Sequence, residues 1–377
     1  MKLRALKAEH GDAFILSTNN AQILIDGGAS GTYQRSLRPS LEMLPDRRID
    51  LAMVSHIDSD HIDGILDLVA EMDDDKADRR QTLVNIREVW HNSFSDLIAS
   101  KDETEEDTTI ATSASARMQE TDDQATLLPQ MVLSSVAEGR KLANMLAVLN
   151  IEVNKKFQNK LVVRDGEMPS FMYGNIKLQV LGPTEKELAK LRKDWKKKLK
   201  GILSKETAEA ASIFDTVKLD RSVSNLASLV VMAQGDGKRI LLTGDARGDM
   251  ILEWLEQTGQ LDANGFATFD LLKLPHHGSR RNLSPEFFQR IKADKYLISG
   301  NGHHGNPEPG VFEWLFAARP ELGFKIYLTY SPNEIKSRKA YIKRGYHTAL
   351  DQVLSDKKRQ ATLEWPKKFD EFIDIEI

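Results

Sequence analysis

Four residues that can bind metal stand close together near the start of the chain: His56, Asp58, Asp60 and His61. A tight loop would gather their side chains, and carboxylates as close as Asp58 and Asp60 would repel each other unless a cation neutralised them. Because the chain contains no cysteine, such a cation must be held by His, Asp or Glu. The spacing therefore predicts a metal site, against the plainer alternative of surface histidines and a helix-capping Asp60.

Three further positions share one design, in which an apolar strand runs directly into a residue that can bind metal. They are Asp26 after residues 22–25, Asp245 after residues 239–242, and the pair His276 and His277 after residues 271–274. A turn aspartate or a capped histidine would explain each one alone, but strand ends of one sandwich can converge on a single edge. We therefore expect one centre. Adjacent strand residues point to opposite faces, so only one of His276 and His277 is expected to be a ligand; the choice between them stays open, and we favour His276.

The intervening segments alternate between predicted strands and helices. Residues 13–16 and 22–25 predict a β-hairpin, and residues 62–72 predict a helix because their apolar residues recur at helical spacing. Other short apolar runs predict the remaining strands, at residues 49–54, 87–90, 177–181, 226–233, 239–242, 271–274 and 324–329. Two further helices are expected at residues 136–149 and 312–316.

One large domain over residues 1–310 is expected, which residues 311–377 complete or extend. It carries a polar insertion at about residues 95–135, either disordered or a lid. A basic helical segment follows at about residues 185–205. Within it, Lys196, Lys197 and Lys198 are candidate nucleic-acid contacts, and the alternative is a solvated helix face.

Composition excludes several classes of protein. The 377 residues are 41% hydrophobic, which suffices for a buried core. No apolar run approaches the roughly 20 residues that a membrane-spanning helix needs, so we expect a cytoplasmic protein with no membrane partner. The formal net charge of -4 gives no general attraction to nucleic acid, although a local basic patch would still provide one. A protein partner and the oligomeric state stay open.

The motif His56-x-Asp58-x-Asp60-His61 resembles the metallo-β-lactamase signature HxHxDH with its second His replaced by Asp, as in the ComEC-type domains related to DNA uptake. The resemblance extends from residue 8 to about residue 310 and includes, in the same order, residues 8–13, 24–28, 55–64, 228–230, 241–245 and 272–279. It implies an αββα sandwich, with two mixed β-sheets flanked by helices. It also implies two divalent metal ions, zinc or manganese, at one edge of the sheets, with a hydrolytic water between them.

The resemblance assigns roles to the candidate residues. We expect His56 and Asp58 on the first ion, with Asp60, His61 and His276 on the second and Asp245 bridging both. Asp26 would orient these ligands through hydrogen bonds. Catalysis would rest on Asp60, Asp245 and His276.

Two features depart from the family pattern. The third-motif histidine has no clear counterpart, and His91 is the only histidine in that part of the chain. The Gly-His-Pro near the end of ComEC-type domains corresponds here to Gly305-Asn306-Pro307, preceded by His303 and His304. One of these two histidines could replace the missing imidazole near the scissile group.

The expected function is that of a metal-dependent hydrolase, most specifically a phosphodiesterase or nuclease acting on DNA or RNA. Two ions about 3.5–4 Å apart suit in-line attack on a phosphodiester, because both the entering and the leaving oxygen need stabilisation. The alternatives are a hydrolase of a small phosphodiester, ester or lactone, since this fold hosts many chemistries, and a non-catalytic partner subunit that keeps the fold.

Overall fold

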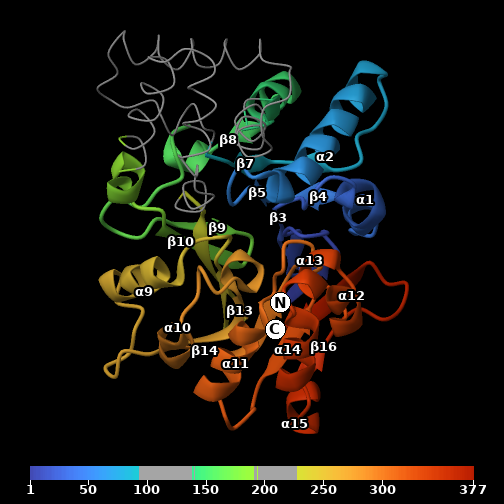
Figure 1. Cartoon of the computed structure of the whole chain (residues 1–377). Helices are drawn as coiled ribbons and strands as arrows, with labels where there is room; N and C mark the ends of the chain where they lie inside the picture. The colour runs from blue at the N-terminus through green and yellow to red at the C-terminus, as the bar shows by residue number, and fades with distance from the viewer. Residues whose placement is uncertain (93–137, 140, 191–192, 194–226) are drawn as a thin grey trace, which may run out of the picture.

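Two β-sheets form the centre of the structure, a computed structural model that describes residues 1–92, 138–139, 141–190, 193 and 227–377 (Figure 1). The first sheet has the strand order β17-β1-β2-β3-β5-β7-β8. Its strands are β1 (Lys2–Leu6), β2 (Phe14–Ser17), β3 (Gln22–Ile25), β5 (Leu51–Met53), β7 (Glu88–Trp90), β8 (Glu152–Val153) and β17 (Phe372–Glu376). A separate pair, β4 (Arg48–Ile49) and β6 (Asn85–Ile86), flanks it.

The second sheet has the strand order β16-β15-β14-β13-β12-β11-β10-β9. Its strands are β9 (Ser170–Tyr173), β10 (Ile176–Gly182), β11 (Val230–Gly235), β12 (Lys238–Leu242), β13 (Ala267–Lys273), β14 (Ile291–Ile298), β15 (Lys325–Leu328) and β16 (Leu363–Glu364). Both sheets are mixed. β3, β5 and β7 run parallel, as do β12 to β16, while the strands from β17 to β3 and from β9 to β12 pair antiparallel.

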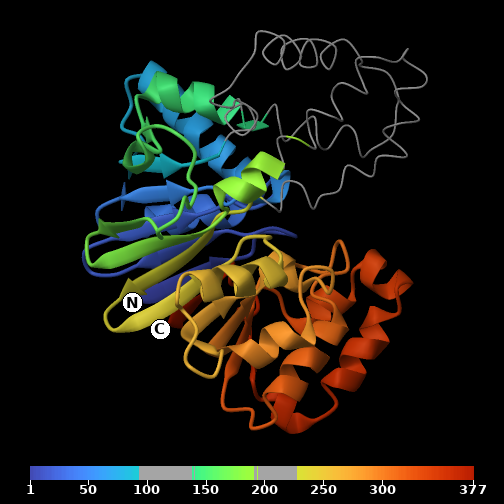
Figure 2. The same cartoon turned by 90° about the vertical axis from the view of Figure 1, so that its left-hand side faces the viewer.

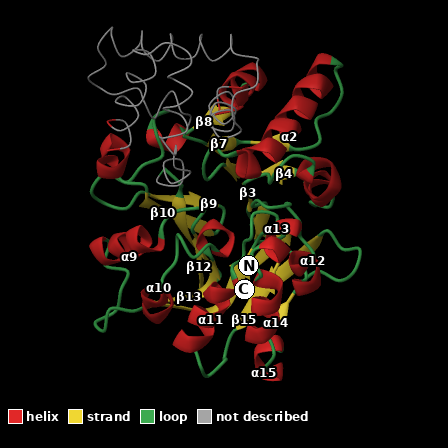
Figure 3. Ribbon diagram, in the orientation of Figure 1, coloured by secondary structure: helices red, strands yellow, loops and turns green. Residues whose placement is uncertain are grey.

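Helices cover the outer faces of both sheets (Figure 3). The first sheet carries α1 (Arg38–Glu42) and α2 (Ser59–Ala77). The second carries α9 (Gly248–Gln257), α10 (Pro285–Arg290), α11 (Pro309–Ala318), α12 (Pro332–Lys336), α13 (Lys339–Lys343), α14 (Tyr346–Val353) and α15 (Lys357–Gln360). Figure 2 shows the sheets edge-on between these two groups of helices.

Three apolar clusters hold these layers together. The central one joins inward-facing residues of the two sheets, such as Phe14 and Met53 with Val231 and Leu271. A second cluster packs α2 against the outer face of the first sheet, and a third packs α9, α10 and α11 against the outer face of the second. The arrangement is therefore the αββα sandwich that the sequence predicts, and the predicted fold class is confirmed.

Helix α2 is the helix that the apolar spacing predicts at residues 62–72, and it extends that prediction at both ends. Ile62, Ile65, Val69 and Met72 are all buried against the first sheet, as a helical period requires. The start of α2 lies directly on the loop that follows β3. A Cβ added to Gly64 would overlap the backbone of that loop, so glycine is required for this close approach.

The C-terminal segment completes both sheets. β15 and β16 extend the second sheet, and β17 pairs with β1 at the edge of the first. The predicted insertion at residues 95–135 and the lysines Lys196, Lys197 and Lys198 lie outside the described residues. Within the part of the chain that the structure describes, no helix has the length and apolar character needed to cross a membrane.

Candidate metal centre

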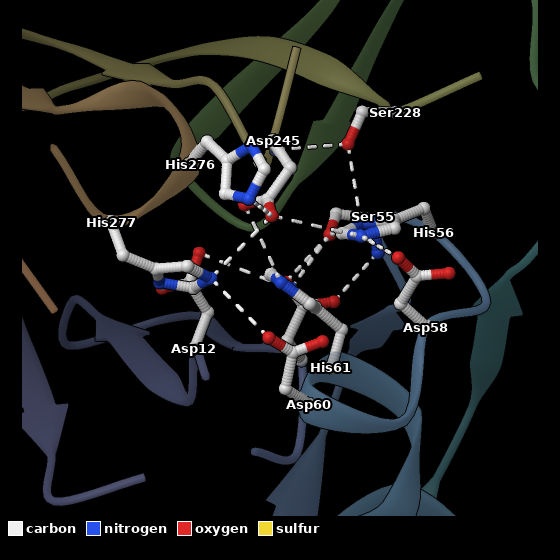
Figure 4. Close-up of polar contacts among 12 residues, drawn as sticks. Asp12, Ser55, His56, Asp58, Asp60, His61, Ser228, Asp245, His276 and His277 are labelled. Atoms are coloured by element: carbon white, nitrogen blue, oxygen red, sulfur yellow. Dashed lines mark hydrogen bonds and ion pairs between the residues drawn. The ribbon is translucent and has the colours of Figure 1, made fainter. Parts of the chain in front are cut away.

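The candidate site lies where strand ends of the two sheets meet, and Figure 4 shows its side chains directed toward one another. β3 leads into Asp26 and β5 leads into His56. β12 leads into Asp245, and β13 leads into His276 and His277. Carboxyl ends of parallel strands share one edge of a sheet, which is why residues so far apart in sequence meet here.

The distances between the donor atoms are longer than hydrogen bonds. His61 Nε2 lies 3.4 Å from Asp245 Oδ1, and His56 Nε2 lies 3.9 Å from Asp245 Oδ2. His56 Nε2 is 3.6 Å from Asp58 Oδ2, and His277 Nε2 is 3.6 Å from an oxygen of Asp60. Donor atoms that face each other across such gaps match the spacing of ligands around one ion, because zinc binds nitrogen and oxygen at about 2.0–2.2 Å.

Several of these atoms are buried and have no hydrogen-bond partner: Nε2 of His56, His61 and His277, and Oδ1 of Asp245. Buried polar atoms are normally paired, because leaving one unsatisfied costs about 1–3 kcal/mol. Four such atoms gathered around Asp245 fit bound cations. Four sets of three residues bring ligand atoms close enough to share an ion, namely His56/His61/Asp245, Asp60/His61/His277, Asp12/Asp26/His61 and Asp12/Asp245/His277.

Hydrogen bonds to Nδ1 orient the imidazole rings. His61 Nδ1 donates to Asp26 Oδ2 at 2.9 Å. His56 Nδ1 lies 3.1 Å from Ser55 Oγ, and the Ser55 hydroxyl donates to Asp26. His277 Nδ1 lies 3.2 Å from Asp12 Oδ1. A proton held on Nδ1 leaves the lone pair of Nε2 directed into the centre, as a metal ligand requires.

His276 and His277 do not continue the strand. β13 ends at Lys273, and both histidines adopt left-handed backbone conformations, with φ of 47° and 54°. Their side chains therefore do not alternate between two faces. His276 Nε2 lies 3.6 Å and His277 Nε2 lies 3.5 Å from Asp245 Oδ2. The expectation that only one of the two rings faces the centre is wrong for this turn, because both rings reach the same carboxylate.

The side chain of Asn282 fixes the tautomer of His276. Its Nδ2 donates to the Asp245 backbone oxygen at 3.0 Å, so its Oδ1 must face the His276 ring. That oxygen lies 2.9 Å from His276 Nδ1 and can only accept. His276 Nδ1 therefore carries the proton, and Nε2 carries a lone pair. His277 belongs to two of the four sets of converging ligand atoms, and His276 adds a second imidazole beside them.

Asp12 and Lys273 are the important residues that the sequence analysis did not select. Both side chains are 1% exposed, and they form an ion pair directly behind the centre. Lys273 Nζ also donates to the Gly244 backbone oxygen at 2.9 Å and lies 3.7 Å from Asp245 Oδ1. Two features of the sequence could have identified them. Asp12 lies within residues 8–13, one of the segments that resemble the family, and Lys273 is a charged residue inside the apolar run 271–274.

Burial and neighbouring charges shift the pKa values of the metal-free site. Burial alone would raise the pKa of Asp12, but Lys273 and His277 hold it below its usual value. The pKa of Asp245 is also well below its usual value despite burial, because three imidazoles surround it. Burial opposes the charged form of His61 and His277, yet Asp245 and neighbouring carboxylates raise both pKa values well above 6.5.

The remaining candidates lie outside the four converging sets of described residues. His91 follows β7 and is buried, and its backbone N–H donates to Asn154 Oδ1 at 2.9 Å. His303 and His304 lie beside His10 rather than among the donor atoms around Asp245. The roles predicted for these three histidines stay predictions.

No protein-family model matches the chain, and no curated protein matches it. Among solved structures, the chain is similar to Zn²⁺-bound PqqB from Methylobacterium extorquens, with 8% identity, 100% of both chains covered and a TM-score of 0.41. It is also similar to the metallo-β-lactamase fold protein YhfI from Bacillus subtilis, with 9% identity, 99% of this chain and 98% of that chain covered, and a TM-score of 0.38. A third is the metallo hydrolase Igni18 from Ignicoccus hospitalis, with 10% identity, full coverage of both chains and a TM-score of 0.33.

These values describe a partial likeness of the backbone and say nothing of activity. The neighbours are metallo-β-lactamase-fold and metallo-hydrolase proteins by their own descriptions. The narrower resemblance to ComEC-type domains stays a prediction from the motifs of this sequence.

Proposed function

We propose that the chain is a hydrolase that uses two divalent cations and that its substrate is a phosphodiester of DNA or RNA. The observation that carries the proposal is the set of buried donor atoms around Asp245 that face one another without hydrogen-bond partners. When bound there, divalent cations supply Lewis acidity and lower the pKa of a water toward neutrality.

The geometry supports a ligand assignment that differs in part from the one expected from sequence. The second ion would take Asp60, His61 and His277, whose ligand atoms form one of the converging sets. The first ion would take His56 and Asp58, whose donor atoms are 3.6 Å apart. His276 would complete the first site, because its Nε2, which carries a lone pair, lies 3.6 Å from Asp245 Oδ2. In this assignment His276 would take the place of the third-motif histidine, which has no clear counterpart in the sequence, and Asp245 would be shared by both ions.

Charge balance supports two ions rather than one. The site gathers five carboxylates from Asp12, Asp26, Asp58, Asp60 and Asp245. Lys273 offsets one of these charges, so four remain. Two divalent cations neutralise four negative charges, whereas a single one would leave two of them uncompensated.

The exposure of the side chains supports one side of the site as the side from which a substrate enters. The side chains of Asp58, Asp60 and His276 are 23%, 20% and 19% exposed. His56, His61 and Asp245 are at most 4% exposed and close the opposite side. Asp12, Asp26 and the serine hydroxyls behind them hold the rings in place. A phosphodiester that enters from the open side would meet both ions at once, which suits stabilisation of the attacking and the leaving oxygen.

The test combines elemental analysis with turnover. Purified protein should bind close to two equivalents of zinc or manganese, and Asp60→Ala and His61→Ala should each lose metal, whereas the control His347→Ala on α14 should not. Metal-loaded protein should hydrolyse bis(p-nitrophenyl) phosphate and single-stranded DNA or RNA. Full metal occupancy with no hydrolysis of any phosphodiester would refute the proposal, and turnover of esters or lactones alone would reassign the substrate.

A further inference from the structure

Three histidines outside the metal centre form a second imidazole cluster, which we call the His10 cluster: His10, His303 and His304. The His10 ring stacks on His303 with centroids 5.4 Å apart and meets His304 edge-on at 4.6 Å. His303 and His304 are 4.7 Å apart. The three residues come from two loops that are distant in sequence, so the fold itself brings them together.

Both loops also contact residues of the metal centre. His10 precedes Asp12 by two residues, so their Cα atoms lie within about 7.6 Å of each other. The backbone N–H of Asp12 donates to the backbone oxygen of Asp60 at 3.2 Å. On the other loop, Asn306 Nδ2 donates to the His276 backbone oxygen at 3.3 Å. Asp12 and Asn306, each two residues from a histidine of the His10 cluster, therefore link these loops to Asp60 and His276, two of the three ligands on the open side.

Guanidinium groups stand around the cluster. Arg344, at the end of α13, lies against Gly305, where an added Cβ would overlap its Nη1. Glu9 pairs with Arg35, and Arg338 Nη2 lies 3.9 Å from it. Glu9 also accepts a hydrogen bond of 2.7 Å from Asn301, which ties the second loop to the first. The Glu9 carboxylate, next to His10 in the sequence, is thus already engaged by Arg35 and Asn301.

Imidazoles and guanidinium groups together are suited to an anion. Both donate hydrogen bonds to phosphate oxygens, and arginine does so in a fixed planar geometry. The three rings are absent from the sets of described residues whose ligand atoms converge on a metal. Stacked and edge-on rings beside a phosphate contact also provide surfaces on which unpaired bases can stack.

We propose that the His10 cluster and Arg344 bind a second phosphate of the substrate, next to the phosphate that is cleaved, so that the enzyme acts on a single-stranded polynucleotide rather than on a small diester. This inference rests on the proposed function. In the family that the motifs resemble, a histidine stands at the position of Asn306. The neighbouring His303 and His304 would provide imidazoles for substrate contact in its place.

The first measurement is binding without turnover. A fluorescein-labelled single-stranded oligonucleotide with phosphorothioate linkages is titrated into metal-loaded protein, and anisotropy is followed over a range of salt concentrations. His303→Ala/His304→Ala should weaken binding by about tenfold or more, since each hydrogen bond to a charged group contributes that much. Arg344→Gln should reduce the salt slope by about 0.7, the value for one phosphate contact on a single strand.

Matched controls separate this role from general charge or folding effects. His347→Ala removes an imidazole on α14, and Lys357→Gln removes a positive charge on α15, which lies apart from α13 in Figure 1. Both should leave the affinity and the salt slope close to those of the unaltered chain. Because Arg344 is exposed, the Arg344→Gln variant should fold even if the double histidine variant does not.

The second measurement compares two substrates. The double histidine variant should lose at least about tenfold more kcat/KM on an oligonucleotide than on bis(p-nitrophenyl) phosphate, which has no second phosphate. Equal losses on both substrates, or unchanged oligonucleotide binding in both variants, would overturn the inference. If the unaltered protein hydrolyses no phosphodiester, the proposed function fails, and the binding measurement still decides whether the cluster contacts phosphate.

Discussion

Replacing Lys273 with methionine removes one positive charge from the interior while nearly preserving the volume of the side chain. The ammonium pairs with Asp12, donates to the Gly244 oxygen and lies 3.7 Å from Asp245. Breaking a fully buried ion pair typically costs about 3–5 kcal/mol, because the remaining charge keeps its desolvation penalty without a partner. We therefore expect Lys273→Met to lower the free energy of unfolding of the metal-free protein by about this amount.

The same substitution should change the acid stability. The pKa of Asp12 is lowered in the folded chain, with Lys273 the leading cause that opposes burial. A lowered carboxyl pKa contributes stability that is present above the unfolded pKa and is lost as the pH falls through the folded value. Without Lys273, the folded pKa of Asp12 rises, so the loss of stability should begin at a higher pH than in the unaltered chain.

Urea unfolding at a series of pH values measures both effects. Lys238→Met is the matched control, because Lys238 forms a surface pair with Asp270 at 2.9 Å and should contribute far less. Lys273→Met/Asp12→Asn should lose less stability than the two single variants together, since the double variant leaves no unpaired charge. Equal losses for Lys273→Met and Lys238→Met, or strictly additive single effects, would contradict the account of the buried pair.

Three further outcomes follow from the site. Metal binding should release protons from His61 and His277, because their pKa values are raised in the metal-free chain and a cation competes with the proton for Nε2, and calorimetry in buffers of different ionisation enthalpy measures this release. Saturating zinc should raise Tm and a chelator should reverse the shift, with a gain of about 2.7 kcal/mol at a free concentration of 100 Kd. Gly11→Ala should disrupt the site, because its Cβ would overlap the Asp60 oxygen, and should cost about 1–3 kcal/mol in urea unfolding, whereas Gly323→Ala has room and should not.

The positions of the ligand-bearing loops could be predicted because they follow from strand periodicity. Short apolar runs that stop at Asp26, His56 and Asp245 indicate strand ends, and the parallel strands of a sheet place such ends on one edge. The structure confirms the strands at β3, β5 and β12 and brings their terminal residues together. These strand ends can be predicted without any knowledge of long-range contacts, because residue spacing and apolar pattern are local properties of the sequence.

The Asp12–Lys273 pair could not be predicted in the same way. Lys273 lies inside an apolar strand, where its side chain could equally have reached solvent by its flexible stem. Its role depends on a carboxylate from the opposite sheet, and sequence spacing carries no information about which residues meet across two sheets. A charged residue inside a buried strand needs a partner that compensates its charge, but the strand pattern does not indicate which residue that partner is.

The pair His276 and His277 shows how a local backbone conformation changes the chemistry of a site. A strand would have turned one ring away, and the centre would then lack an imidazole. Two successive left-handed residues instead direct both rings at Asp245, at a cost of roughly 1–2 kcal/mol each for non-glycine residues. Asn282, Asp12 and the following Gly278, with φ of 78°, hold this turn in place. Strain of this kind persists only where the surroundings fix it. These contacts hold both imidazoles at Asp245 in a conformation that the strand pattern of the sequence does not predict.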